Sequence, residues 1–227
     1  MTQNQSPPDS VPTQTQPDLA RVPLPDVSPT SVADLVDVDR VMDPGIRPLW
    51  PGMPRVIGPA YAVRCAPGDN LMMHAAIYRA EPGSVIVVDS GGSPLAVAGG
   101  NVCAVAQRRG IAAFVIDGNI RDLQEARDAG FPVFARGVFP KPGTKHDVVP
   151  SGEAAVGGVR VRTGDVVVAD EEGIVVVEGH RAVELLDAAA EREAGEESQR
   201  LDDWEAAHRR KIEAGLAAGG DNSGLPD

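Results

Sequence analysis

The sequence predicts an α/β fold in which parallel strands alternate with helices. Two apolar runs of β type, Val85–Asp89 and Ala113–Asp117, each precede a glycine-containing turn and then a segment of helical type. Alternation of strand and helix implies parallel pairing through helical crossovers. Hydrophobic residues make up 42% and charged residues 24% of the 227 residues, as in ordinary globular proteins. A core of this size needs no disulfide framework or structural metal.

Composition divides the chain into a central folded region and two tails. Residues 1–27 are rich in Pro, Gln, Ser and Thr, and residues 218–227 are rich in Gly and polar side chains. Such segments bury too little apolar surface to fold, so we expect both to be disordered. Between them we expect an α/β domain over residues 28–180 and a C-terminal helix over residues 181–217.

Local signals place the elements of the central region in order. The expected helices cover residues 30–42, 70–80, 101–109 and 121–129. The first takes its cap from Thr30 or Ser31, and the last two end at glycines. The expected strands cover residues 56–65, 85–89, 113–117, 133–135, 159–161, 166–169 and 174–177. Short turns join the last three strands, which predicts a β-meander after the parallel region.

Charge and residue usage exclude several classes of function. The formal net charge is −12 and aromatic residues make up only 4%, which excludes a general nucleic-acid-binding role. No apolar run approaches the roughly 18 residues that span a membrane, and the N-terminus lacks the pattern of a signal peptide. Cys65 and Cys103 are the only cysteines, so we expect a protein of the reducing cytoplasm.

The strongest chemical signal is the pair Arg121–Asp122, which follows the strand 113–117 and Gly118. In open α/β sheets, ligands bind at the carboxyl ends of strands beside helix N-termini. Arg121 can hold a carboxylate through two hydrogen bonds, and Asp122 can bind a hard divalent cation through waters. In the structural alternative, Asp122 only stabilises the helix dipole and Arg121 pairs with Glu125.

A second segment, Gly99-Gly100-Asn101, also opens a helix after a glycine-rich loop. Two helix starts that face one another would form an anion pocket. In the alternative interpretation, Asn101 only caps its helix.

Other polar residues are weaker candidates. His74 lies on the helix 70–80, Lys145 and His146 lie in a loop, and Asp89 ends a strand. Each has a structural explanation: a packed helix histidine, a mobile surface pair and a loop cap. Lys141, like Lys145, lies among prolines and glycines, which argues against a Schiff-base lysine.

The run GGNVCAVAQRRGIAAFVIDGNIRDLQEARDAGFPVFARG is similar to the RraA-like family. So are IGPAYAV, DNLMMHAAIYRAEPGSVIVVD and GGVRVRTGDVVVADEEGIVVV, in the same order, so that the resemblance covers residues 30–200. That family includes the 4-hydroxy-4-methyl-2-oxoglutarate / 4-carboxy-4-hydroxy-2-oxoadipate aldolases and the regulator-of-ribonuclease-E-like proteins. The resemblance implies a swivelling β/β/α domain with a C-terminal helix, assembled as a homotrimer or homohexamer with sites at subunit boundaries.

The resemblance also implies the roles of the site residues. The aldolases depend on a divalent metal, Mg²⁺ or Mn²⁺, and form no Schiff base. Arg121 matches the arginine that binds the pyruvyl carboxylate and keto oxygen, and Asp122 matches the aspartate that holds the metal. The implied substrate-binding residues are Gly99, Gly100, Asn101, Val102 and Arg121. Glu196 or Glu197 matches a glutamate that a neighbouring subunit contributes in some members.

Gly100 departs from the aldolase pattern, because the aldolases carry at this position an aspartate implicated in proton transfer. Regulator-type members also lack it, but they tend to lose the metal-binding aspartate too, whereas this chain keeps Arg121 and Asp122. We therefore expect a metal-dependent lyase that acts on a small 2-keto acid through a pyruvate enolate. Loss of a general base costs about 10²–10⁴-fold, so decarboxylation of an oxaloacetate-type acid is favoured over aldol cleavage. The alternatives are a non-catalytic regulatory protein and an enzyme of specialised metabolism that reuses the pocket.

Overall fold

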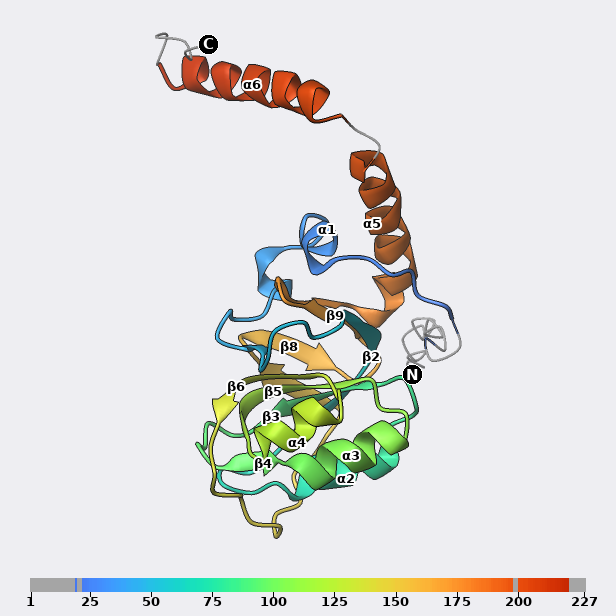
Figure 1. Ribbon diagram of the computed structural model, residues 1–227, viewed down its shortest axis with the longest axis vertical. Coiled ribbons are helices and arrows are strands. Elements are labelled where there is room, and N and C mark those ends of the chain that lie inside the picture. Colours follow the sequence, from blue (N-terminus) through green and yellow to red (C-terminus); the bar gives the residue numbers. More distant parts are fainter. Residues whose placement is uncertain (1–18, 20–21, 198–199, 221–227) are drawn as a thin grey trace, which may run out of the picture.

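A mixed β-sheet organises the computed structural model, which describes residue 19 and residues 22–197 and 200–220 (Figure 1). Across these residues the sheet has eight strands in the order β1-β6-β5-β3-β2-β9-β10, with β4 paired to β5. A separate hairpin joins β7 and β8. The strands are β1 (Arg47–Pro48), β2 (Val56–Arg64), β3 (Val85–Asp89), β4 (Ala96–Ala98), β5 (Ala113–Ile120), β6 (Val133–Val138), β7 (Glu153–Val156), β8 (Val159–Arg162), β9 (Val166–Asp170) and β10 (Gly173–Val177).

The parallel half of the sheet confirms the predicted α/β alternation. Strands β2, β3, β5 and β6 pair in parallel. The crossover helices α2 (Leu71–Arg79), α3 (Gly100–Arg108) and α4 (Leu123–Asp128) lie together on one side of the sheet (Figure 1). The apolar runs that predicted the central strands are buried, as a sheet covered by helices requires.

The antiparallel end of the sheet only partly follows the expected meander. Strands β9 and β10 form a hairpin, and β9 also pairs with β2. Strand β8 does not join them, because it pairs with β7. β7 is a strand that the sequence interpretation missed.

The helix expected over residues 30–42 is wrong in extent. The structure has a short helix α1 (Pro29–Ala33) and a 3-10 turn η1 (Val38–Arg40). The cap is Ser28, whose Oγ accepts the backbone N–H of Ser31, and not Thr30 or Ser31. After η1 the chain runs extended along strand β10, where the Met42 N–H donates to the carbonyl oxygen of Ile174 and Val41 forms a bridge with Val175.

Two boundaries near the expected site also differ. Strand β5 continues through Gly118 to Ile120, and α4 begins at Leu123, not at Arg121. The strand continues because Ser90 packs where a side chain at position 118 would lie, with its Cβ only 2.7 Å from that point. The short strand β4 was also missed.

The C-terminal region contains two helices where one is expected. They are α5 (Ala182–Glu197), preceded by the 3-10 turn η2 (Gly179–Arg181), and α6 (Leu201–Ala218). Most of the predicted N-terminal tail, and residues 221–227 of the predicted C-terminal tail, lie outside the described residues. Among the residues that the structure places, no helix has the length and hydropathy needed to cross a membrane.

Apolar side chains form two clusters. The larger surrounds the parallel strands and their helices, and includes Phe114 and Phe131 in edge-to-face contact with ring centroids 4.6 Å apart. The smaller, which we call the outer cluster, lies between β9, β10 and α5 and includes Val27 and Leu186. The outer cluster fastens α1 and α5 to the sheet, whereas the larger cluster positions the strand ends described next.

Candidate functional site

A small hollow of about 60 Å³ lies where β4 and β5 end beside the first turns of α2 and α3. It brings together five of the six predicted site residues: Gly99, Asn101, Val102, Arg121 and Asp122. The remaining lining residues are Asn70, His74, Ala96, Ala98, Pro142 and Lys145. The sixth predicted residue, Gly100, is buried beside the hollow and does not line it.

The geometry of Arg121 and Asp122 is fixed by the backbone. The Arg121 N–H donates to the carbonyl oxygen of Ala98 at 3.0 Å, which ties the end of β5 to β4. Asp122 then adopts a left-handed conformation with φ of 56°, the only described non-glycine residue with positive φ. Strain of this kind clusters at functional sites. Its carboxylate turns back toward α3, where Oδ2 accepts the Gly100 N–H at 3.3 Å.

The ion partner of Arg121 is Asp122, with Nε 3.5 Å from Oδ2, and not the Glu125 of the structural alternative. Both side chains stay about two-fifths exposed, at 42% and 39%. The pair is therefore open to a ligand and is weakly held by itself.

Gly99 makes room for the side chains of Arg121 and Asp122, and Gly100 makes room for that of Glu125. A Cβ on Gly99 would lie 2.6 Å from Oδ2 of Asp122 and 3.0 Å from Cγ of Arg121. A Cβ on Gly100 would overlap the carboxylate of Glu125. The turn between β4 and α3 must therefore be glycine at both positions while the facing side chains keep their places.

The first turn of α3 presents free donors to the hollow. The first intrahelical hydrogen bond of α3 runs from the Cys103 N–H to the carbonyl oxygen of Gly99, at 3.0 Å. The N–H groups of Asn101 and Val102 precede it, and both residues line the hollow. Two such N–H groups beside Arg121 suit an anion such as a carboxylate.

Asn70 is a site residue that the sequence interpretation missed. Its side chain is buried, and Nδ2 donates to the carbonyl oxygens of Ala96 and Gly143, at 3.4 Å each. These bonds orient Oδ1, which is buried without a hydrogen-bond partner. A buried acceptor left unpaired is costly, and the hollow that Asn70 lines is where a ligand would supply the missing donor. In the sequence Asn70 resembles a helix cap, yet its side chain makes no capping bond.

His74 and Lys145, two weaker candidates, also reach the hollow. Burial lowers the pKa of His74, and the positive charge of Lys145 lowers it further. The imidazole is therefore neutral near pH 7 and can accept a proton or a hydrogen bond.

The other candidates lie elsewhere. The N–H of His146 donates to Asp69, and Oδ1 of Asp89 caps the Gly91 N–H at 2.8 Å, as a loop cap would. Glu196 forms an i,i+4 ion pair with Arg192 on α5, and the side chain of Glu197 is outside the described part of the chain.

The donors at the hollow fit a hydrated Mg²⁺ better than a metal held by protein ligands alone. Within the described residues no three His, Cys, Asp or Glu side chains gather as a metal cluster. Asp122 offers one half-exposed carboxylate beside the hollow. Mg²⁺ keeps several waters and commonly binds through one or two carboxylates together with its substrate, so Asp122 would hold it in this way.

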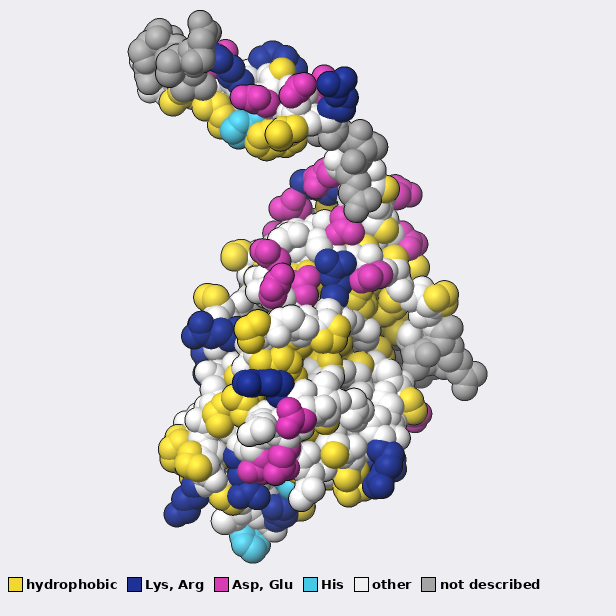
Figure 2. All heavy atoms as spheres, in the orientation of Figure 1, with side chains coloured by type: hydrophobic (Ala, Val, Ile, Leu, Met, Phe, Trp, Pro, Cys, Tyr) yellow, Lys and Arg dark blue, Asp and Glu magenta, His cyan; other side chains and the backbone are white. Residues whose placement is uncertain are grey.

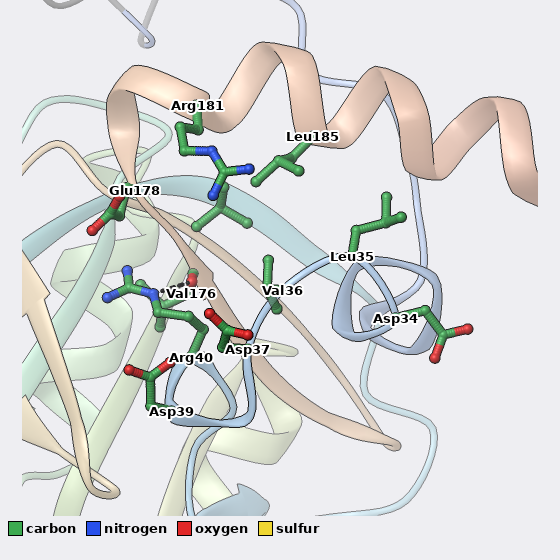
Figure 3. Close-up of a pocket in the computed structure, with 11 residues that line it drawn as sticks. Asp34, Leu35, Val36, Asp37, Asp39, Arg40, Val176, Glu178, Arg181 and Leu185 are labelled. Atoms are coloured by element: carbon green, nitrogen blue, oxygen red, sulfur yellow. Dashed lines mark hydrogen bonds between the residues drawn. The ribbon is translucent and has the colours of Figure 1, made fainter.

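A larger hollow, of about 540 Å³, lies between η1, β10 and the start of α5 (Figure 3). It contains none of the predicted site residues. Arg40 is held there by the carbonyl oxygen of Val176, at 3.0 Å, and lies 3.7 Å from Asp165. Asp34, on its rim, pairs with Arg192 at 2.6 Å. The buried Nη2 of Arg40 has no hydrogen-bond partner among the described residues. The smaller hollow is the better candidate for the predicted chemistry because it brings together five of the six predicted site residues.

Known proteins resemble this chain over most of its length. A curated relative from Halalkalibacterium halodurans, named "Putative 4-hydroxy-4-methyl-2-oxoglutarate aldolase", is 37% identical over 175 residues, which cover 75% of this chain and 81% of the relative. A relative of the same name from Albidiferax ferrireducens is 38% identical over 156 residues, covering 64% of this chain and 89% of the relative.

Solved structures show the same fold. Streptomyces coelicolor RraAS2, described as an unusual member of the RNase ES inhibitor RraA protein family, matches with a TM-score of 0.67 and 30% identity, covering 75% of this chain and 91% of that chain. The RNA-processing inhibitor RraA from Thermus thermophilis matches with a TM-score of 0.61 and 27% identity, covering 67% of this chain and 93% of that chain. The family model described as "RraA-like: Aldolase/RraA" matches residues 29–176. The chain therefore belongs to the RraA-like family.

Proposed function

We propose that this protein is a divalent-metal-dependent carbon–carbon lyase that acts on a small 2-keto acid through a pyruvate enolate. The observation that carries the proposal is the meeting of Arg121 and Asp122 with the free N–H groups of Asn101 and Val102 in one hollow. The names of the two curated relatives support the same class of reaction.

Different groups in the hollow bind different parts of the substrate. The N–H groups of Asn101 and Val102 bind the carboxylate of the keto acid, and Arg121 binds the carboxylate and the keto oxygen. Negative charge that develops on the keto oxygen is stabilised by the Arg121 guanidinium. A Mg²⁺ held by Asp122 would supply further Lewis-acid stabilisation of that charge.

Asn70 and His74 line the same hollow and offer further hydrogen-bonding groups to a substrate. The unpaired Oδ1 of Asn70 accepts a hydrogen bond from a substrate hydroxyl or from a bound water. His74 is neutral and can accept a hydrogen bond, but burial and the charge of Lys145 lower its pKa, which makes it a weak base. Gly100 supplies no carboxylate, so decarboxylation, which needs no base on a hydroxyl, is expected to outrun aldol cleavage.

Pyruvate release from oxaloacetate and from 4-hydroxy-4-methyl-2-oxoglutarate, with Mg²⁺ and with EDTA, tests the proposal. Arg121→Lys keeps the charge but loses the planar fork, and is expected to lower kcat/KM about 10²–10³-fold on both substrates. Arg127→Lys, on the exposed face of α4 and away from the hollow, is the matched control and should leave both rates unchanged. Metal-independent turnover, or equal rates for the two arginine variants, would refute the proposal.

A regulatory binding role is the second candidate, and the absence of a carboxylate at Gly100 favours it. In that case neither keto acid turns over, with or without Mg²⁺, although the chain is folded. The resemblance to RraAS2 and RraA makes a ribonuclease the first partner to test by pull-down. We also propose assembly as a homotrimer or homohexamer, which light scattering measures directly.

A further inference from the structure

The larger hollow, between η1, β10 and the start of α5, has the size of a ligand site. Its volume of about 540 Å³ falls in the range of about 300–1,000 Å³ that small-molecule pockets occupy in proteins. One wall is the chain from the end of α1 through η1, and the other is the end of β10 with η2 and the first turn of α5 (Figure 3). The residues of the smaller hollow, which carry the proposed lyase chemistry, are not part of either wall.

Two side chains of opposite charge point into the larger hollow from opposite walls. Arg181, at the end of η2, points in from the side of α5, and Asp37, directly before η1, points in from the other side (Figure 3). Asp37 occupies the capping position of η1, yet its carboxylate makes no capping hydrogen bond. Within the described residues neither side chain forms a hydrogen bond or an ion pair. Each is therefore available to a ligand group of the opposite charge.

Arg40, a third ionic residue of the lining, is directed away from the hollow. Its Nε donates to the carbonyl oxygen of Val176, its Nη1 donates to the carbonyl oxygen of Arg160 at 3.4 Å, and its Nη2 lies 3.7 Å from Oδ2 of Asp165. Arg160 and Asp165 do not line the hollow, so the unpaired Nη2 faces the body of the protein. Arg181 therefore supplies the guanidinium that a ligand meets.

The surroundings of Arg181 and Asp37 are acidic. Figure 2 shows acidic side chains gathered over α1 and the segment that follows it. Three further carboxylates belong to the lining, those of Asp34, Asp39 and Glu178, and Figure 3 shows them turned away from the centre of the hollow. An acidic rim attracts a cationic group and opposes a ligand that carries negative charge alone. A ligand with positive charge alone would leave Arg181 unpaired, whereas a small zwitterion satisfies both side chains.

Apolar side chains line the space between the two charges. Figure 3 shows Leu185 of α5 and Val36 beside this space, with Leu35 next to them. Leu185 is 7% exposed to solvent, whereas Leu35 and Val36 are only half-buried. A ligand with an aliphatic side chain would cover Leu35 and Val36, which adds affinity in proportion to the apolar area removed from water.

We propose that the larger hollow is a binding site for an aliphatic α-amino acid. The carboxylate of the amino acid accepts two hydrogen bonds from the Arg181 guanidinium, and its ammonium group donates to the carboxylate of Asp37. Its aliphatic side chain packs on Leu35 and Val36. The bound amino acid joins the η1 wall to the α5 wall, and because it binds only the folded chain it raises the free energy of unfolding.

Calorimetric titration of the full chain with L-leucine tests the site, and one leucine is expected to bind to each chain. Glycine is expected to bind more weakly, by about four-fold for each buried CH₂ that it lacks. 4-Methylpentanoate lacks the ammonium group and 3-methylbutylamine lacks the carboxylate. Each is expected to bind about 10–100-fold more weakly than leucine, because each leaves one ionic side chain unpaired. Failure of leucine to bind, or equally tight binding of 4-methylpentanoate, would overturn the proposal.

Substitutions at the two ionic residues assign the two ends of the ligand. Asp37→Asn is expected to weaken leucine binding about 10–100-fold and to remove the difference between leucine and 4-methylpentanoate. Arg181→Gln is expected to weaken leucine binding by a similar factor and to remove the difference between leucine and 3-methylbutylamine. Both residues are exposed, so both variants should fold as the unaltered chain does, which urea unfolding checks. Asp128→Asn and Arg127→Gln, exposed on α4, make the same changes in net charge and should not affect leucine binding.

Three further results would contradict the site. Equal weakening of leucine by Asp128→Asn or Arg127→Gln would show that binding follows net charge. Leucine that stays tighter than 4-methylpentanoate in Asp37→Asn would show that the ammonium group binds elsewhere. Arg121→Lys should leave leucine binding unchanged, and loss of binding in that variant would place the amino acid in the smaller hollow. Because turnover of a keto acid is not measured, failure of the proposed lyase activity would leave this test intact.

Discussion

At position 99 the site has room only for hydrogen, because the side chains of Arg121 and Asp122 approach within 2.6–3.3 Å of where a Cβ would lie. Gly99→Ala is therefore expected to displace both side chains and to lower kcat/KM for keto-acid turnover about 10²-fold, the usual result of a displacement near 1 Å. Steady-state pyruvate release measures it.

Gly215→Ala is the matched control for this substitution, since a Cβ there meets nothing within 4 Å. It should leave turnover unchanged. Full activity in Gly99→Ala would show that Arg121 and Asp122 can move apart without loss, contrary to the geometry described here.

Both cysteines are expected to be unreactive in the folded protein. Burial raises the pKa of Cys65 to about 11 and that of Cys103 to about 12. Because the thiolate is the reactive form, neither should be modified by an aromatic disulfide reagent at pH 8, and both should react in denaturant. His208→Cys, on exposed α6, is the positive control and should react at once. Rapid labelling of the unaltered folded chain would contradict this burial.

The sequence identified the residues of the site that carry local signals, and missed those defined by distant contacts. Arg121 and Asp122 could be identified from the sequence because they follow an apolar strand. The importance of Asn70 depends on the carbonyl oxygens of Ala96 and Gly143, which lie 26 and 73 residues away in the chain. No local pattern could show that these bonds use up Nδ2 and leave Oδ1 unpaired.

At the scale of elements, Asp69 fastens the loop after β6 to the start of α2. Its Oδ1 accepts the Leu71 N–H at 2.8 Å, and its Oδ2 accepts the Thr144 hydroxyl at 2.9 Å and the His146 N–H at 2.7 Å. Burial by itself would raise the pKa of Asp69, but these hydrogen bonds outweigh burial and hold the pKa below its usual value. The loop carries Lys145, so this clamp also positions a residue of the hollow.

The clamp predicts a dependence of stability on pH. Because the pKa of Asp69 is lower in the folded than in the unfolded chain, its contribution is full above the unfolded value and is lost as pH falls through the folded value. Asp69→Asn should reduce the slope of unfolding free energy against pH below about pH 5, by at most one proton. Urea unfolding at pH 7, 5 and 3.5 measures it, with the exposed Asp128→Asn as control. If the slope of unfolding free energy against pH were the same in the unaltered chain, Asp69→Asn and Asp128→Asn, the hydrogen bonds of Asp69 would not stabilise the fold as described.

The elements that the sequence predicted correctly are those in which local and tertiary preferences agree. Strand β3 is apolar up to its last residue, Asp89, and its four valine and isoleucine residues are buried on both faces. The expected helix over residues 30–42 failed because Val41 forms a bridge with Val175 of β10, a partner far away in the sequence. The end of β5 was placed too early because Gly118 resembles a turn, whereas in the sheet it makes room for Ser90.

At the scale of the whole molecule, strand β2 joins two regions. One of its edges pairs in parallel with β3, and the other pairs antiparallel with β9. The alternation of strands and helices predicted the first pairing, since crossovers impose it. The second joins segments about a hundred residues apart in the chain, and no local signal specifies it. This second pairing attaches the outer cluster, and with it α5, to the end of the sheet away from the hollow (Figure 1).

Substitutions in the outer cluster should therefore change the stability of the fold without changing turnover at the hollow. Leu186 is fully buried in the outer cluster, so Leu186→Ala is expected to lower the free energy of unfolding by about 2–5 kcal/mol through lost burial and a residual cavity. Val183→Ala, on the same helix but 36% exposed, should change it by less than about 0.5 kcal/mol. Urea unfolding measures both.

Below the unfolding transition, kcat/KM of Leu186→Ala should stay within about two-fold of the unaltered chain, because the hollow is positioned by the larger cluster. A loss of turnover as large as that in Gly99→Ala would show instead that the outer cluster positions the site, and that the two ends of the sheet are coupled through β2.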